Sequence, residues 1–205
     1  MSDRPELKLK LRFQCSRSPK RLRDAVERME GVLDAMMPGW ADNLSTRNTA
    51  TRFIKYLAEF HQPIDLEEIF GSSFVAEDDH HAMVIQTNVP FRMICEHHLL
   101  PATGKASLAY IPNGKIIGLS KMTRLIQACG TEKPSLQEHI VDRVVSLMDT
   151  HLVPKGIMVV VKAQHGCMSC RGVNAPGVDT ISSAVKGVFR DVPHARAEVL
   201  SLINE

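Results

Sequence analysis

Cysteine and histidine residues form two short clusters that have the spacing of a metal site. The clusters consist of Cys95, His97 and His98, with Glu96 between them, and of His165 and Cys167. Two thiolates and one imidazole, from Cys95, Cys167 and His98, are three ligands, the number that a catalytic zinc site takes from the protein while its fourth position stays open for water. His97 and His165 would then lie beside the metal without binding it. A metal with two uncommitted imidazoles next to it indicates hydrolytic chemistry.

A closed structural site is the alternative that the same residues allow. Cys167 and Cys170 are spaced as C-x-x-C, so they could join Cys95 and His98 as the four ligands of a tetrahedral zinc ion. Two arguments oppose this site. Cys167 and Cys170 point to opposite faces if the segment between them stays extended, and a closed site leaves the two remaining histidines without a role.

A candidate anion site follows at Ser120, Lys121 and Arg124. Ser120 is placed to cap a helix, and the two cations lie in its first turn, where backbone N–H groups also attract phosphate. Taken alone, a capped surface helix with solvated cations is the simpler interpretation. Arg52 and Arg171 are further candidate cations, each with the alternative of an ordinary surface arginine.

Gln137 and Glu138 begin a long predicted helix. A carboxylate at that position is favoured by the helix dipole, so ordinary helix-start residues are the first interpretation. A carboxylate beside an amide is also a pair that can recognise the edge of guanine, because it accepts hydrogen bonds from the ring N–H and the exocyclic amine.

The predicted helices and strands can bring these clusters together. The first eighty residues are mainly helical in pattern, with helices expected at 18–36 and 49–60. Strands are expected later at 83–89, 104–111, 115–119, 157–163 and 185–190, and helices at 120–129, 134–152 and 195–203. Both metal clusters follow a strand, so neighbouring strand ends can join them. The pattern predicts an α+β fold in which a helical part precedes antiparallel strands crossed by two helices.

The composition is that of an ordinary globular protein. The chain has 205 residues, of which 44% are hydrophobic and 23% charged, and no apolar run approaches the ~20 residues of a membrane span. Five cysteines, an odd number, fit reduced thiols in the cytoplasm better than a disulfide framework. Basic residues crowd into 8–23, where a solvated arm and helix face is the simpler interpretation. Neither nucleic acid nor a membrane is therefore an expected partner.

Together, these clusters resemble the motifs of GTP cyclohydrolase I in order and spacing. The matching blocks are C-E-H-H at 95–98, A-Y-I-P at 109–112, G-L-S-K at 118–121, Q-E at 137–138 and H-x-C-M-x-x-R-G-V at 165–173. The resemblance runs from about Asn48 to Asn204. It implies hydrolytic opening of the imidazole ring of the guanine of GTP, with release of formate and formation of 7,8-dihydroneopterin triphosphate. A related enzyme of the same fold that acts on another purine or pterin is the alternative.

The resemblance also implies a role for each candidate residue. The zinc ligands that it implies are Cys95, His98 and Cys167. The catalytic residues that it implies are His97 and His165 in acid/base roles and Ser120 near the ribose. The substrate-binding residues that it implies are Lys121, Arg124, Arg171 and Arg52 for the triphosphate, and Glu138 with Gln137 for guanine. Cys170 falls at a position that is not a ligand in the family.

The fold that the resemblance implies is the tunnelling fold, an antiparallel four-stranded sheet with two helices on one face, here preceded by an N-terminal helical part. We expect a basic arm and N-terminal helix at 1–47 and a catalytic domain at 48–205. In the family, sheets join into pentameric rings and two rings stack into a homodecamer. Active sites lie between subunits, so Arg52 can serve the site of a neighbouring subunit.

The sequence departs from the family pattern at a few positions. The segment 129–135 lacks the arginine that is usual before the Q-E pair, His139 stands where the family usually has arginine, and Ala50 replaces a proline. None of these changes removes an implied zinc ligand or acid/base residue. They leave room for altered affinity, assembly or regulation.

Overall fold

The computed structural model describes residues 19–75 and 82–203, which belong to two compact units divided between Gln62 and Pro63. The basic residues that precede position 19 lie outside the described residues, and the expected division between 47 and 48 stays a prediction. Within the described ranges, no helix combines the length and the apolar character needed to cross a membrane.

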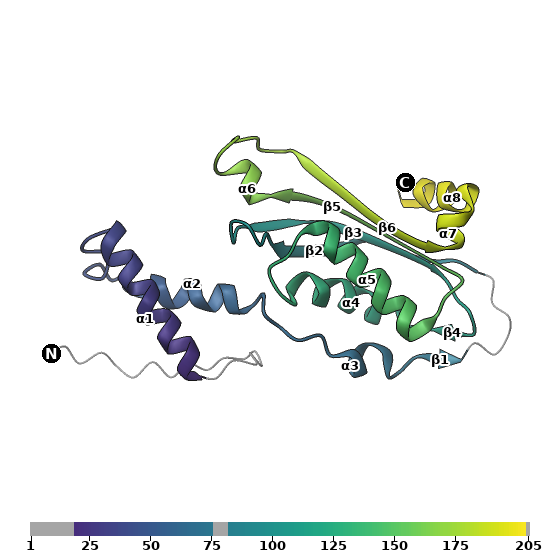
Figure 1. The fold of residues 1–205 in the computed structure, drawn as a ribbon, viewed down its shortest axis with the longest axis horizontal. Coiled ribbons are helices and arrows are strands. Elements are labelled where there is room, and N and C mark those ends of the chain that lie inside the picture. The colour runs from purple at the N-terminus through teal and green to yellow at the C-terminus, as the bar shows by residue number, and fades with distance from the viewer. Residues whose placement is uncertain (1–18, 76–81, 204–205) are drawn as a thin grey trace. The chain divides into compact units, whose positions relative to one another are not determined.

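The first unit contains α1 (Pro19–Met36) and α2 (Thr49–Ala58), close to the two helices predicted there (Figure 1). A small core forms around Leu33 of α1, Trp40 of the connection and Ala50 of α2. The large apolar area of the tryptophan compensates for the small number of buried residues in this unit. The core therefore fixes the connection between the two helices.

The second unit is built on an antiparallel sheet of four strands in the order β2-β3-β5-β6. The strands are β2 (Val84–Ile94), β3 (Pro101–Ile111), β5 (Gly156–His165) and β6 (Asp179–Gly187). The register places Ala102, near the start of β3, beside His165, at the end of β5. The turn between β2 and β3 therefore lies next to the end of β5 (Figure 1). Both clusters of cysteine and histidine residues were expected at this end of the sheet.

Two helices, α4 (Leu119–Thr131) and α5 (Gln137–Leu152), cover one face of this sheet (Figure 1). The core between the helices and the sheet includes Leu108, Tyr110, Val159, Met122, Ile126, Val144 and Met148. α4 lies so close to β2 that a Cβ atom at Gly130 would stand 2.3 Å from the carbonyl oxygen of Arg92. The arrangement confirms the predicted α+β architecture, the tunnelling fold.

Part of the opposite face is also covered, by two helices that follow β6. They are α7 (Val188–Asp191) and α8 (Pro193–Ile203). Phe189 and Val199 of these helices pack with Ala109 and Met158 of the sheet. Those two strand residues face away from the main core because successive side chains of a strand alternate between its faces.

The position predicted for the last strand is wrong, because β6 lies at 179–187 rather than 185–190. Its first half carries Thr180, Ser182 and Ser183, and a hydrophobic pattern does not register such polar residues. Ser182 is nevertheless buried, on the side of β6 that faces α5. The remaining short elements are α3 (Leu66–Phe70), β1 (Phe74–Val75), β4 (Lys115–Ile116), which pairs with β1, and α6 (Gly166–Ser169).

Candidate functional site

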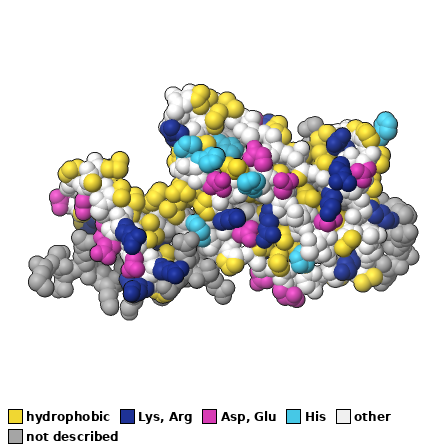
Figure 2. Space-filling view, viewed as in Figure 1, with side chains coloured by type: hydrophobic (Ala, Val, Ile, Leu, Met, Phe, Trp, Pro, Cys, Tyr) yellow, Lys and Arg dark blue, Asp and Glu magenta, His cyan; other side chains and the backbone are white. Residues whose placement is uncertain are grey.

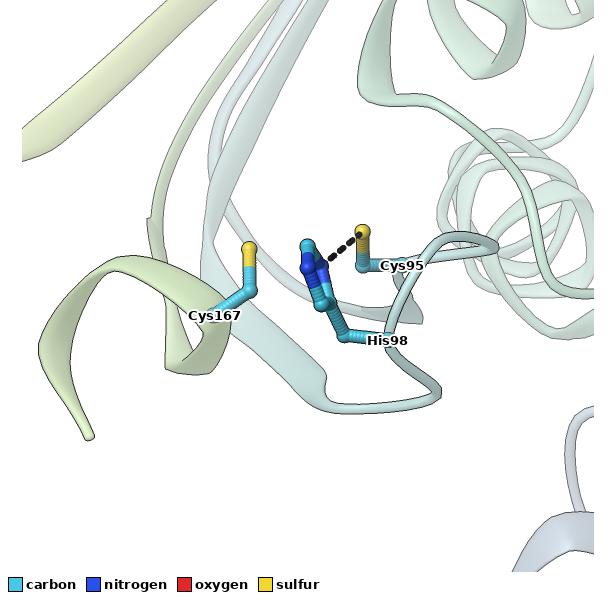
Figure 3. Close-up of side chains that lie close together, drawn as sticks. All are labelled: Cys95, His98 and Cys167. Carbon is cyan, nitrogen blue, oxygen red and sulfur yellow. Dashed lines mark hydrogen bonds between the residues drawn. The ribbon is translucent and has the colours of Figure 1, made fainter. Parts of the chain in front are cut away.

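The three expected metal ligands, here called the metal group, lie together at one end of the sheet. Cys95 directly follows β2, His98 lies in the turn to β3, and Cys167 lies in α6 at the end of β5. One ligand atom from each residue lies within 4.8 Å of the others, and Sγ of Cys95 stands 4.0 Å from Nδ1 of His98. Figure 3 shows the His98 ring between the two sulfur atoms.

A tight turn holds Cys95 and His98 in this arrangement. The N–H of Cys95 donates to the carbonyl oxygen of Leu100 at 3.0 Å, and the N–H of Leu99 donates to the carbonyl oxygen of Cys95 at 2.9 Å. Leu99 closes the turn in the left-handed region, with a φ of 53°. The chain thereby reverses from β2 into β3 within a few residues.

The geometry of the metal group fits a zinc ion. With Zn–S bonds of about 2.3 Å and Zn–N bonds of about 2.0 Å, a sulfur and a nitrogen ligand of a tetrahedral site stand roughly 3.6 Å apart. The 4.0 Å between Cys95 Sγ and His98 Nδ1 is close to that value. Two thiolates and one imidazole are also a donor set that zinc accepts readily. The described residues thus contain a group of three ligands that could hold a metal ion.

The electrostatics of the two thiols point the same way. Burial raises the pKa of the Cys167 thiol, and the neighbouring Cys95 raises it further through its charge and a hydrogen bond, while Arg171 opposes the effect. A divalent cation reverses this balance because it attracts both thiolates. The thiols of Cys95 and Cys167 are therefore better suited to bind one cation together than to ionise without it.

Cys170 lies outside the metal group. The segment that follows β5 is not extended, as the sequence argument assumed, but forms the single helical turn α6. Cys170 comes after that turn and is exposed, and its Sγ donates to the carbonyl oxygen of Gly166 at 2.8 Å. Within the described residues, the ligand group therefore contains Cys167 and not Cys170.

Arg171 and His97 are exposed beside the metal group. Nη1 of Arg171 donates to Nε2 of His98 at 2.7 Å, which leaves Nδ1 as the ring nitrogen that faces the thiols. The ring centroids of His97 and His98 are 6.1 Å apart, with the ring planes at 89°. Figure 2 shows histidine side chains gathered at the end of the unit that carries α6.

His165 and Gln137 are joined by a hydrogen bond. Nε2 of His165, a half-buried residue, lies 2.8 Å from Oε1 of Gln137. Burial lowers the pKa of His165, and the charge of Glu138 opposes that effect. Gln137 is only 1% exposed, whereas Glu138 is exposed. Of the pair expected to contact guanine, Glu138 is thus the residue open to a ligand.

The expected anion site lies at the start of α4, far from the metal group. Nζ of Lys121 donates to the carbonyl oxygen of Glu68, and Arg124 forms an ion pair with the Glu68 carboxylate. The backbone at the start of α4 accepts a hydrogen bond from Gln86 of β2 at 2.9 Å. Gln86 precedes Cys95 by nine residues, which is about 30 Å along a strand. The start of α4 and the metal group therefore lie at opposite ends of β2.

The structure also locates the remaining expected residues. Ser120 is exposed in the first turn of α4, but the expectation that it caps the helix is wrong, because Gly118 is the N-cap residue. Arg52 is exposed on α2 of the first unit, and its Nη1 donates to the carbonyl oxygen of Ser45 at 3.0 Å. Glu68 was not expected, since an acid in the first turn of a short helix looks like an ordinary helix start.

Comparison with known proteins places these features in a family. The family model described as GTP cyclohydrolase I matches residues 18–204. The GTP cyclohydrolase 1 of Brevibacillus brevis is 41% identical over 163 residues, which cover 79% of this chain and 87% of the relative. The enzyme of that name from Bacillus subtilis is 43% identical over 159 residues, covering 76% and 82%. That of Streptococcus agalactiae serotype V is 34% identical over 183 residues, covering 87% and 97%. The chain belongs to the GTP cyclohydrolase I family of enzymes.

Proposed function

We propose that this protein hydrolyses the imidazole ring of the guanine of GTP, with GTP and one water giving formate and 7,8-dihydroneopterin triphosphate. The observation that carries the proposal is the metal group, which lies beside two histidines in a chain of this family. Opening the ring requires an activated water and groups that move protons as the bonds from C8 to nitrogen break.

The resident metal of the proposed site is zinc, held by Cys95, His98 and Cys167. Zinc, when bound, supplies Lewis-acid activation, which allows water to act as a nucleophile near neutral pH. Cys95 is buried and Cys167 partly so, whereas the turn that carries His98 is exposed. The two thiols thus lie toward the interior of the protein, and a substrate can reach the metal group from the side of the turn. The need for reduced thiols also supports a cytoplasmic location.

The proton transfers are assigned to His97 and His165. His97 is exposed beside the metal group and can donate to a ring nitrogen of guanine as it leaves C8. His165 ends β5 and is oriented by its hydrogen bond to Gln137, so it can exchange a proton near the ribose. Histidine suits both tasks because its ordinary pKa lies close to neutral pH.

Substrate recognition is assigned to residues at both ends of the sheet. Glu138, exposed near His165, accepts from the guanine edge, and Arg171 binds phosphate from its position beside the metal group. Ser120, Lys121 and Arg124 take the ribose and triphosphate side. Arg52 of the first unit is a further phosphate ligand.

A site divided in this way requires at least two copies of the chain. The metal group and the start of α4 are about 30 Å apart along β2, so the triphosphate of a nucleotide at one metal group must meet α4 of another copy. Strands β2 and β6 each pair on one side only among the described residues, and free sheet edges invite pairing. We propose the decamer of two stacked pentamers that the family resemblance implies.

The proposal is tested by incubating the purified protein with GTP and measuring formate by a formate dehydrogenase assay. The pterin product is measured in parallel by fluorescence after oxidation. Equal amounts of formate and pterin are expected. A folded, zinc-loaded protein that binds GTP but releases no formate would refute the function.

A further inference from the structure

Gln137 is a polar side chain buried in a place where its hydrogen bonds are fully determined. It opens α5 and is 1% exposed. Its Nε2 lies 3.1 Å from the carbonyl oxygens of both Val161 and Thr180 and 3.3 Å from Oγ of Ser182. Its Oε1 faces Nε2 of His165 at 2.8 Å. The side chain therefore links α5 to both β5 and β6, and it also contacts His165 at the end of β5.

The orientation of this amide is dictated by its surroundings. Backbone carbonyl groups only accept hydrogen bonds, so the atom that faces Val161 and Thr180 must be the NH2 group. Turning the amide over would place its oxygen against two carbonyl oxygens in a buried site, where unpaired polar atoms are costly. The oxygen of Gln137 is thus directed at His165 by two strands of the sheet.

This orientation decides which nitrogen of His165 carries a proton. An amide oxygen accepts and cannot donate, so Nε2 of His165 must be the donor of their hydrogen bond. A neutral imidazole protonated at Nε2 has its lone pair at Nδ1. Nδ1 is then the ring atom that can take a proton from, or return one to, another molecule.

We propose that Gln137 is a positioning residue that fixes the ring of His165 and presents its Nδ1 to the substrate. The inference rests on the proposed acid/base role of His165, and it replaces the direct contact between Gln137 and guanine that the sequence suggested. Gln137 acts through His165, since its amide is buried and bonded to protein. Holding a catalytic ring in one orientation matters because small displacements of reacting groups cost large factors in rate.

The first test is the Gln137→Leu variant, which keeps the approximate volume and removes both ends of the amide. We expect kcat to fall about 10- to 100-fold, at or below the lower end of the roughly 100- to 10,000-fold contribution of a proton-transferring group, while the KM for GTP changes less than about twofold. Ser182→Ala is the matched control, because it removes one partner of the Gln137 amide and keeps both carbonyl anchors. It should retain the wild-type kcat. A rise in KM at unchanged kcat in Gln137→Leu would show direct substrate contact and overturn the inference.

A double-mutant cycle with His165→Gln separates positioning from general destabilisation. If Gln137 acts through His165, Gln137→Leu lowers kcat in the wild-type background and has no further effect in the His165→Gln background. A full additional loss in that background overturns the inference. If His165→Gln alone turns over GTP at the wild-type rate, the proposed role of His165 fails. If His165→Gln is impaired and Gln137→Leu is not, the positioning role alone fails.

A measurement on the unchanged enzyme covers the case in which Gln137→Leu does not fold. Solid-state 15N NMR of zinc-loaded protein labelled at histidine distinguishes protonated from unprotonated ring nitrogens, with His165 assigned by the signals lost in His165→Gln. The inference predicts a protonated Nε2 and an unprotonated Nδ1 in the neutral ring. The opposite tautomer would overturn it.

Discussion

Replacing the two cysteines of the C-x-x-C segment one at a time distinguishes an open metal site from a closed one. Cys167 contributes a ligand atom to the metal group, whereas Cys170 is exposed and donates to the carbonyl oxygen of Gly166. Cys167→Ser should therefore lose zinc affinity and Cys170→Ser should keep it. The two variants are matched controls because they make the same chemical change three residues apart.

The expected size of the loss follows from the number of ligands. Binding of zinc to four-ligand peptide sites is worth about 10–16 kcal/mol, or roughly 2.5–4 kcal/mol per ligand. Since about 1.4 kcal/mol corresponds to a factor of ten, losing one thiolate weakens binding by about 100- to 1,000-fold. A serine hydroxyl does not restore it, because it stays protonated at neutral pH and lacks the charge of a thiolate.

Zinc affinity can be measured by competition with a chromophoric chelator, with circular dichroism as the check that each variant is folded. We expect zinc binding about 100- to 1,000-fold weaker for Cys167→Ser and a dissociation constant within about twofold of wild type for Cys170→Ser. Equal losses in both variants would refute the open site and restore the closed one that C-x-x-C spacing allows.

Further outcomes concern the start of α4, the assembly and the core. Arg124→Gln should raise the KM for GTP about tenfold, as expected for a lost charge-assisted hydrogen bond, and leave zinc content unchanged. Glu68→Gln should lower the KM for GTP about two- to fivefold, the size of an exposed ion pair, because the Glu68 carboxylate competes with the triphosphate for Arg124. Steady-state kinetics measures both effects, and unchanged KM values in both variants would remove this end of the sheet from the site. If the site spans two copies, co-expressed Arg124→Gln and His165→Gln chains should form mixed oligomers in which some sites carry both native residues. At GTP concentrations well below the raised KM, these oligomers should turn over GTP faster than either variant alone, and mixed oligomers without any gain would contradict the division. Burial, and then the charge of Glu132, raise the pKa of Cys129 from 9.0 to about 12, so the native state keeps this thiol protonated while the unfolded chain ionises. The stabilisation is full below pH 9 and is lost as pH rises toward 12, by about 1.4 kcal/mol per pH unit between these two values. Because the unfolded thiol ionises only near pH 9, urea unfolding at pH 8 and 10 should show a total fall of about 1.4 kcal/mol in wild type and a smaller fall in Cys129→Ala.

Much of the site is predictable because the end of one strand and the start of its antiparallel neighbour lie at the same end of the sheet. Cys95 follows one such strand and Cys167 another, and the register of Ala102 with His165 brings them together. The spacing of the residues along the chain then suffices to place the metal group. The two helices on one face are predictable in the same way, from apolar residues at helical spacing.

The parts that could not be predicted depend on contacts between distant segments or on a single turn. The four residues of α6 are too few to show a helical period, so the position of Cys170 could not be derived. Glu68 meets Arg124 across a long stretch of chain, and no local pattern signals such a pair. Gln137 was expected to contact guanine because an amide beside a carboxylate can recognise the guanine edge and because the resemblance implied it. It is buried because carbonyl groups of β5 and β6 satisfy its amide.

We propose that the metal group of this chain opens the guanine ring of GTP. The most direct measurement is the amount of formate released per GTP by the purified protein, before and after removal of metal by a chelator and after zinc is added back. We expect one formate per pterin product, a rate of formate release below about 1% of the initial rate after chelation, and recovery of the rate when zinc is added back. Formate release that continues at full rate in protein shown to be free of metal would contradict this role of the metal group.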